Sequence, residues 1–217
     1  MFRPKTNKAQ PTDKEPYVIY PFHSQDINNR NWQNNYRIIS IDPANKNFAI
    51  RVEERLTYPT TLLFKRLSLS DNNDLTSVYQ TLTYFLDQYL ELFLTCHLVI
   101  VERQLPTNYR AVRISQHVIS YFMLRLKDQP LLPIIIEINP KLKSKQLLAP
   151  SSLNDRGIKK WAIEKAIELL TSRSDIVGLN IINKERKKDD LADTVVQIEA
   201  FFNYFDLLSN QYILASY

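Results

Sequence analysis

Residues 98–101 read Leu-Val-Ile-Val, and this short apolar run restricts the fold of the chain more than any other feature. An unbroken run of this kind is typical of a strand that is buried on both faces, as in a parallel sheet with helices on each side. Residues 133–138 have the same character. Segments with helical spacing of apolar residues separate or follow these strands, at 109–126, 156–171 and 189–208. The chain is therefore expected to be an α/β protein.

The earlier part of the domain predicts a meander of strands at 37–42, 47–52 and 61–69, followed by a helix at 75–93. The complete order is βββαβαβαα, which predicts a mixed five-stranded sheet with helices on both faces. Residues 1–35 are rich in Asn, Lys, Pro and Gln and are expected to form a flexible N-terminal arm before a single domain at 36–217. Within the arm, an apolar patch from Tyr17 to Phe22 is able to pack on the body.

The composition excludes several classes of protein. With two glycines in 217 residues, a glycine-rich phosphate loop of the P-loop or Rossmann kind is excluded. The single cysteine, Cys96, forms neither an internal disulfide nor a cysteine-based zinc cluster, and it fits a reducing compartment. No apolar stretch is long enough to span a membrane, and the N-terminus lacks the apolar core of a signal peptide, so a soluble intracellular protein is expected. A net charge of +5 permits binding to a polyanion.

Carboxylates follow two of the predicted strands directly. Asp42 ends the first strand and Glu102 ends the run at 98–101. An unpaired charge at the edge of a core is costly unless a cation or a hydrogen bond stabilises it. Farther along, Asp190 and Asp193 are three residues apart and share one face of a helix. Because hard divalent cations prefer oxygen ligands, and two-metal phosphoryl chemistry takes about three or four carboxylates, the sequence predicts a magnesium site.

Each of these acids also has a simpler interpretation. Asp42 with Pro43 is able to open a turn, since Asp bonds to nearby backbone and Pro presets the next φ angle. Asp189 and Asp190 are able to complement a helix N-terminus. Glu102 is able to pair with Arg103 or Arg110. The metal site is favoured because four such coincidences occur together.

Basic residues near these acids are candidates for phosphate contacts. Arg103, Arg110 and Arg113 could track a phosphate backbone beside Glu102, although arginine is common on exposed helix faces. Three lysines follow the last predicted strand, and one of them could stabilise developing charge near a scissile group, but a solvated loop is expected for at least two of them; they are Lys141, Lys143 and Lys145. Lys187 and Lys188 are further candidates for DNA contacts. His23, His97 and His117 lack metal-ligand spacing, and structural roles are expected for them.

The chain resembles the RuvC-type Holliday junction resolvases of the ribonuclease H-like superfamily, especially their mitochondrial and poxvirus branches. Ser40-Ile41-Asp42-Pro43-Ala44-Asn45-Lys46-Asn47-Phe48-Ala49 resembles the first strand and turn of that family. Ile100-Val101-Glu102-Arg103-Gln104 resembles its second acidic motif, and Lys187-Lys188-Asp189-Asp190-Leu191-Ala192-Asp193-Thr194 its C-terminal motif. The resemblance spans about 37–205, and one departure is the Pro-Ala after Asp42, where these families often have a glycine.

The resemblance implies a structure-selective endonuclease that resolves four-way DNA junctions by paired nicks. Two Mg²⁺ or Mn²⁺ ions would be held by the catalytic carboxylates Asp42, Glu102, Asp190 and Asp193, with Asp189 as a neighbour of these ligands. Asp189 and, from its position after the last predicted strand, Lys143 are the candidates for an auxiliary role. A homodimer is implied as well, because a four-way junction has approximate two-fold symmetry. A viral replication site and an organelle both fit the resemblance as places of action.

Three alternatives remain open from the sequence. One is a related nuclease for another branched DNA or for an RNA/DNA hybrid. Another is a catalytically inactive nucleic-acid-binding or scaffold protein of the same fold, since a fold does not determine a function. The third is a protein with no nuclease role and scattered surface acids, for which replacing Asp193 would leave divalent-ion affinity unchanged.

Overall fold

The computed structural model describes residues 16–20, 36–55, 58–71, 74–129 and 133–215, with side chains as far as residue 205. Its centre is one six-stranded sheet with strand order β1-β6-β5-β2-β3-β4. The strands are β1 (Tyr17–Tyr20), β2 (Tyr36–Asp42), β3 (Phe48–Arg55), β4 (Thr60–Leu67), β5 (Leu98–Glu102) and β6 (Ile134–Ile138). The helices are α2 (Leu75–Asp87), α3 (Leu90–Phe93), α4 (Tyr109–Arg125), α5 (Lys141–Gln146), α6 (Asp155–Ser172), α7 (Ile176–Lys184) and α8 (Asp189–Ala215).

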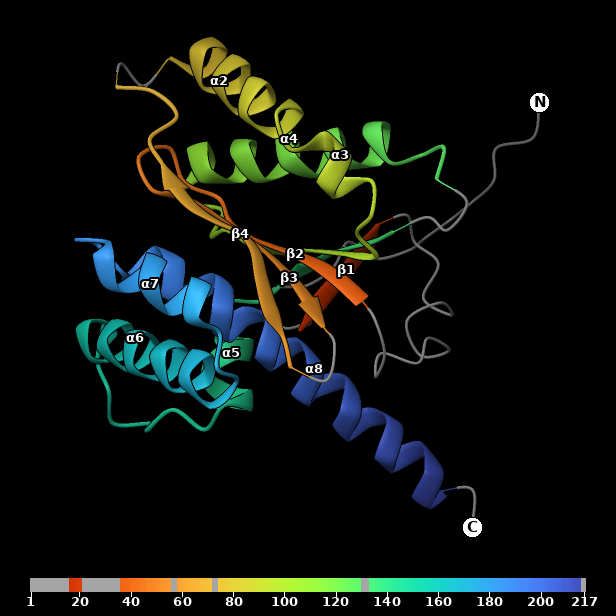
Figure 1. Ribbon diagram of the computed structural model, residues 1–217, viewed down its shortest axis with the longest axis vertical. Helices are drawn as coiled ribbons and strands as arrows, with labels where there is room; N and C mark the ends of the chain where they lie inside the picture. Colours follow the sequence, from red (N-terminus) through yellow and green to blue (C-terminus); the bar gives the residue numbers. More distant parts are fainter. Residues whose placement is uncertain (1–15, 21–35, 56–57, 72–73, 130–132, 216–217) are drawn as a thin grey trace.

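The sheet is mixed, as the sequence predicts. Strands β2, β3 and β4 form an antiparallel meander, whereas β2, β5 and β6 run parallel to one another. Figure 1 shows α2, α3 and α4 on one face of the sheet and α5 to α8 on the other. Helices on both faces confirm the predicted α/β layering and explain why β5 is apolar throughout its first four residues.

The sheet has six strands and not the expected five. Tyr17–Tyr20, which was expected to belong to the arm, pairs antiparallel with β6 as the edge strand β1. Within this pairing the Tyr20 hydroxyl donates to Glu137 Oε2 at 3.4 Å, across 117 positions of sequence. A four-residue strand whose partner is so distant in sequence has no local pattern that identifies it. The rest of the predicted arm, apart from Pro16, lies outside the described residues.

Several helices differ from the prediction in number or length. The expected helix at 75–93 is divided into α2 and α3, and the last helix runs to Ala215 and not to about 208. The loop expected around Lys141–Gln146 is the short helix α5, and α7 was not predicted. No helix among the described residues has the length and apolar character that a bilayer crossing requires.

The alternation of side chains along β2 determines on which face of the sheet the candidate site lies. Ile39 and Ile41 belong to the core cluster that packs against α2 and α4, whereas Ile38 belongs to the cluster that packs against α8. Because successive side chains of a strand point to opposite faces, Ser40 and Asp42 lie on the α8 side with Ile38. The same alternation places Glu102 on the α8 side with Leu98 and Ile100. Both acids therefore face the helix that carries Asp190 and Asp193.

Candidate functional site

Asp42 and Glu102 lie side by side at the carboxyl ends of two adjacent parallel strands, β2 and β5. Ile41 pairs in parallel register with Val101, so the residue that follows each of them ends its strand at the same level. The carboxyl ends of adjacent parallel strands are where open α/β sheets place their ligand sites. Glu102 forms an ion pair with Lys143.

Helices α5 and α8 complete the cluster. Lys143 Nζ lies 2.5 Å from Glu102 Oε2 and 2.7 Å from Asp193 Oδ1, so one ammonium links the strand acid to the helix acid. The Lys143 side chain is 10% exposed. It is the third residue of α5, a helix that was expected to be a loop. Lys141 and Lys145, on either side of it, are exposed as expected. Asp42, Glu102, Lys143 and Asp193 are called the site cluster below.

Charge in the site cluster is unbalanced, and the pKa values reflect it. Burial raises the pKa of Asp42 well above its usual range, and repulsion from Glu102 adds to the shift. Burial also raises the pKa of Glu102, in opposition to the nearby Lys143 ammonium. Burial alone would lower the pKa of Lys143, but the carboxylates of Glu102, Asp193 and Asp42 outweigh it and raise that pKa, so this lysine remains cationic. Three carboxylates thus share one internal ammonium.

Asp190 and Asp189 have separate partners in the first turn of α8. Lys187 Nζ donates to Asp190 Oδ2 at 2.8 Å, and Lys159 Nζ of α6 donates to Asp189 Oδ2 at 3.0 Å. Burial raises the pKa of Asp190. For Asp189, burial acts in the same direction, but the hydrogen bond from Lys159 and the charge of Lys187 outweigh it and lower the pKa. Asp190 belongs to the same electrostatic environment as Asp42, which its charge influences.

A lysine ammonium occupies the space between the carboxylates of the site cluster. Among the described residues, no three His, Cys, Asp or Glu side chains are grouped in a way that holds a metal ion directly. The Lys143 ammonium instead stands between Glu102 and Asp193. The donors are nevertheless carboxylate oxygens, which hard divalent cations prefer. Burial is the main reason that the pKa values of Asp42 and Glu102 are raised, and repulsion between neighbouring carboxylates adds to it.

A cleft of about 890 Å³ opens beside the site cluster. Glu102, Lys143 and Asp193 form part of its wall, so three of the four members of the site cluster face the cleft. The β5–α4 loop contributes one side, and α5 with the loop that follows it contributes the other. Further lining residues include Arg103, Gln104, Leu105, Lys141, Lys145, Ala149, Pro150, Leu153, Asp155, Ile158 and Lys159. A basic cleft of this size suits part of an extended polyanion.

The basic residues proposed from the sequence divide into two groups. Arg103, Lys141 and Lys145 line the cleft. In the part of the chain that the structure describes, Arg110 and Arg113 do not line it and instead approach the Tyr109 ring, at 6.0 and 5.9 Å from its centroid. Lys187 is bound to Asp190, and Lys188 donates to Asn183 Oδ1 at 3.4 Å.

Lys159 is a cleft residue that the sequence did not reveal. It lines the cleft and forms the ion pair with Asp189 described above. Its partner lies 30 positions away, and nothing in the helical pattern of α6 distinguishes it from the exposed Lys160 beside it. Only the packing of α6 against α8 brings it to the site.

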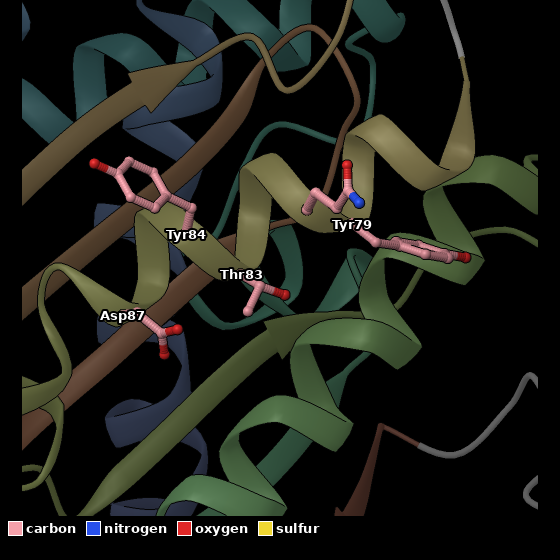
Figure 2. Close-up of a pocket in the computed structure, with 5 residues that line it drawn as sticks. Tyr79, Thr83, Tyr84 and Asp87 are labelled. Carbon is pink, nitrogen blue, oxygen red and sulfur yellow. The ribbon is translucent and has the colours of Figure 1, made fainter.

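A second, shallower cavity of about 380 Å³ lies on α2, on the opposite side of the sheet from the site cluster. Figure 2 shows that Tyr79 and Thr83 point toward α4, whereas Tyr84 points away from it. His117 of α4 stacks on the Tyr79 ring with centroids 4.7 Å apart and lies 2.9 Å from Thr83 Oγ1. These contacts hold two helices together.

The other histidines show comparable contacts or fall outside the description. His97 Nδ1 accepts a hydrogen bond from the Arg37 backbone N–H at 3.1 Å, and its ring meets Tyr36 edge-on. His97 and His117 therefore contact neighbouring strands and helices, which fits the structural roles expected for them. His23 lies outside the described residues.

Comparison with known proteins gives relatives in sequence and in structure. No family model matches the chain. Uncharacterized protein 97L of Invertebrate iridescent virus 3 is 30% identical over 116 residues, which are 54% of this chain and 53% of the viral protein. Uncharacterized protein 170L of Invertebrate iridescent virus 6 is 27% identical over 142 residues, or 57% of each chain. The chain thus spans about half the length of the curated relatives it matches.

Solved structures are similar over most of the chain. The yeast mitochondrial Holliday junction resolvase Ydc2 aligns with a TM-score of 0.58 at 15% identity, covering 86% of this chain and 90% of that one. RuvC of T. thermophilus in complex with Holliday junction substrate aligns with a TM-score of 0.55 at 13% identity, covering 78% and 96%. The layered mixed sheet and these alignments together identify the fold: the chain has the ribonuclease H-like fold of the RuvC-type resolvases.

Proposed function

We propose that this protein is a divalent-metal-dependent nuclease that nicks branched DNA, with the four-way junction as its main substrate. One observation carries the proposal: Glu102 and Asp193 line a basic cleft and share the Lys143 ammonium, and the buried Asp42 lies beside Glu102 at the end of the neighbouring parallel strand. Perturbed carboxyl pKa values in a cleft are a common feature of catalytic sites. The fold supports the proposal, since Ydc2 is a Holliday junction resolvase and the T. thermophilus protein binds a junction substrate.

Asp42, Glu102, Asp190 and Asp193 are the proposed ligands of two Mg²⁺ or Mn²⁺ ions. Bound ions would supply an activated water and charge stabilisation at the leaving 3′ oxygen of a phosphodiester. For Glu102 and Asp193 to serve as ligands, Lys143 must give up at least one of its two ion pairs. Lys187 must likewise release Asp190. The lysines thus hold the carboxylates in place while no other cation is bound.

Lys143 then acts on the substrate side of the site. Because its pKa is raised, it remains an ammonium at neutral pH. It lines the cleft together with Glu102 and Asp193. From this position it can hold a phosphate oxygen near the carboxylates and stabilise charge that develops there. Arg103, Lys141, Lys145 and Lys159 line the same cleft and are proposed to contact flanking phosphates.

A homodimer is part of the proposal. Paired nicks in a four-way junction need two active sites, and a two-fold axis supplies them in the symmetry of the junction. Each protomer would direct its cleft to one of two strands related by that axis.

A second candidate is a DNA-binding protein of the same fold that does not cut. The ion pairs of Lys143 favour it, because an internal ammonium satisfies Glu102 and Asp193 without any metal ion. Such a protein would bind junctions equally well in EDTA and in magnesium. The two candidates differ in one observable property, the appearance of nicks.

The test uses four labelled substrates: a four-way junction, a flap, a matched duplex and an RNA/DNA hybrid. Each is incubated with the purified protein in Mg²⁺, in Mn²⁺ or in EDTA. The proposal expects symmetric nicks in the junction that require metal and disappear in Asp193→Asn. Asp155→Asn is the matched control, because Asp155 lines the cleft but belongs to an exposed helix start and should leave nicking intact. Junction binding without nicks under both metal conditions would favour the second candidate.

A further inference from the structure

A buried acid lies on the face of the sheet opposite to the site cluster. Glu137 of β6 is 8% exposed and pairs in parallel register with Val101 of β5. Its neighbours Ile136 and Ile138 pack on the α8 side, so Glu137 points to the other side, where α4 lies. A buried carboxylate is costly unless it is paired or hydrogen-bonded. Glu137 therefore needs partners on the α4 side of the sheet.

Three partners from separate parts of the chain act on Glu137. Ser115 of α4 donates to its Oε1 at 3.1 Å, and Tyr20 of β1 donates to its Oε2. The third partner is Arg103, because burial raises the pKa of Glu137 while the Ser115 hydrogen bond and the Arg103 charge oppose the rise. Burial and the Glu137 charge also raise the pKa of Tyr20, and Arg103 again acts against them. The Arg103 charge is thus felt by both members of the Tyr20–Glu137 pair.

The geometry of β5 explains why Arg103 acts on this acid. The Arg103 N–H donates to Ile138 O at 2.8 Å, so the pairing with β6 continues one residue past the end of β5. Because side chains alternate along an extended chain, Arg103 belongs to the opposite face from Glu102 and to the same face as Glu137. It follows Val101, the register partner of Glu137, by two residues, and diagonal neighbours on one face of a sheet are within reach of a long side chain. Arg103 also lines the cleft, so it connects the two faces of the sheet.

We propose that Glu137 is a positioning residue that orders the Arg103 side chain at the cleft, where Arg103 binds a phosphate of branched DNA. This role rests on the proposed function, because it requires that the cleft binds DNA. A free arginine side chain loses conformational freedom when it binds a phosphate, and a carboxylate that already orders it reduces that cost. Glu137 thus contributes to DNA binding without contacting DNA.

Two effects of Glu137 on DNA binding have opposite signs, which makes the role testable. Its negative charge repels phosphates, so charge alone predicts that Glu137→Gln binds DNA more tightly. Its attraction for Arg103 orders the guanidinium, so positioning predicts that Glu137→Gln binds DNA more weakly. Glutamine has the same size and still accepts the Ser115 hydrogen bond, but its neutral amide attracts a guanidinium less strongly. The direction of the change therefore distinguishes positioning from a general effect of charge.

The experiment is a double-mutant cycle on the affinity for a four-way junction, measured by fluorescence anisotropy in EDTA so that no nick forms. The proteins are the wild type, Glu137→Gln, Arg103→Gln and the double variant, each titrated at several salt concentrations. Glu54→Gln is the matched control, since it removes the same charge from an acid that pairs with Arg37 near the start of β2, at the other end of that strand from Asp42. Glu137→Met is a second variant that places no polar group in the buried position, and melting temperatures report whether each protein is folded.

Arg103→Gln should lower junction affinity about 5-fold or more, as expected for one lost charged hydrogen bond. It should also reduce the slope of log affinity against log salt by about one unit. Glu137→Gln and Glu137→Met should each lower affinity about 3-fold or more, and the double variant should bind no more weakly than Arg103→Gln alone, because both changes remove the same phosphate contact. Glu54→Gln should bind at least as tightly as the wild type.

Two results would overturn the positioning role and leave the nuclease proposal intact. One is a folded Glu137 variant that binds the junction as tightly as the wild type or more tightly. The other is a pair of losses that add fully in the double variant, because Glu137 would then act independently of Arg103. Failure of the wild-type protein to bind the junction at all would overturn both proposals.

Discussion

Two clusters of buried charge lie on the α8 side of the sheet, and they differ in how their charges are balanced. One is the site cluster, in which three carboxylates surround one ammonium. The other is a set of three arginines and three carboxylates that ties β3 to α7 and α8. We call it the arginine network; its members are Arg51, Glu53, Arg55, Arg173, Asp175 and Glu199.

The arginine network is deeply buried and well connected. The side chain of Arg51 is fully buried and donates to Glu53 Oε2 at 3.1 Å, Thr61 Oγ1 at 2.7 Å and Asp175 Oδ2 at 2.9 Å. Asp175 also caps α7, because its Oδ1 accepts the Gly178 N–H. Each positive charge therefore meets a negative one, and the helix start is satisfied within the same set.

The pKa shifts of the two clusters have opposite signs. For Glu199, burial would raise the pKa, but Arg55 and Arg173 outweigh it and lower that pKa. Asp175 behaves in the same way through Thr61, the Gly178 backbone and Arg51. In the site cluster, burial and like charges raise the pKa of Asp42. Balanced charge thus supports the fold, whereas surplus charge beside a cleft marks the place where a cation or substrate is needed.

The largest predicted effect is a loss of stability when the arginine network is broken. Arg51→Met should lower the free energy of unfolding by about 3–5 kcal/mol, because Glu53 and Asp175 remain buried without their cation. Urea unfolding followed by circular dichroism measures it. Arg156→Met, an exchange on the exposed start of α6, is the control and should change stability by less than about 0.5 kcal/mol. A loss for Arg51→Met as small as the control would contradict the structural role of the network.

Replacing the cation of the site cluster by methionine should lower the free energy of unfolding by a smaller amount. Lys143→Met is expected to lower the free energy of unfolding in EDTA by about 1–3 kcal/mol, since carboxyl groups with raised pKa values can take up protons when the ammonium is lost. Magnesium should restore much of this loss by occupying the vacated place, whereas it should not rescue Arg51→Met. Equal behaviour of the two variants in magnesium would remove the distinction between the clusters.

Opposite pH dependences provide a sharper comparison. The folded pKa of Asp42 is above its unfolded value, so its ionisation opposes folding, and the penalty grows as pH rises from the unfolded pKa through the folded one. The folded pKa of Glu199 is below its unfolded value, so its contribution is present above the unfolded pKa and is lost as pH falls through the folded one. In EDTA, Asp42→Asn should therefore gain stability relative to the wild type as pH rises from acid to neutral, while Glu199→Gln should lose it. Parallel curves would contradict the assigned shifts.

The smallest predicted change in stability comes from Asp193→Asn. Removing one of three neighbouring carboxylates relieves repulsion but also weakens the Lys143 ion pair, so the net change in EDTA should stay within about 1 kcal/mol. The variant should nevertheless lose the rise in melting temperature that magnesium gives the wild type. Differential scanning calorimetry with and without magnesium measures both quantities, and an undiminished magnesium response in the variant would exclude Asp193 as a ligand.

The sequence predicts one of the two clusters much better than the other. Asp42 and Glu102 are visible because each interrupts an apolar strand, and Asp190 with Asp193 because of their helical spacing. Arg51 and Glu53 alternate with apolar residues in β3, a pattern that ordinarily indicates a solvated face, yet α7 and α8 cover them. Their burial depends on partners such as Asp175, 124 positions away, which no local pattern reports.

Short elements limited the prediction of the site itself. Lys143 was singled out from the sequence, but its place between Glu102 and Asp193 depends on the six-residue helix α5, which is too short for a periodic pattern. The strand β1 has the same limitation, since four residues that pair with β6 carry no recognisable alternation. Elements with long patterns, such as α6, were predicted within one residue at each end.

The most direct test of the account is a single-turnover reaction of a preassembled complex. The protein is bound to a labelled four-way junction in EDTA, and excess Mg²⁺ is then added, with the wild type and Asp193→Asn compared at equal occupancy. The account predicts that both proteins bind, that the wild type nicks opposed strands, and that the variant is slower by more than the roughly 10–100-fold typical of losing a residue outside the ligand set. A fully occupied wild-type complex that remains intact in both Mg²⁺ and Mn²⁺ would contradict it.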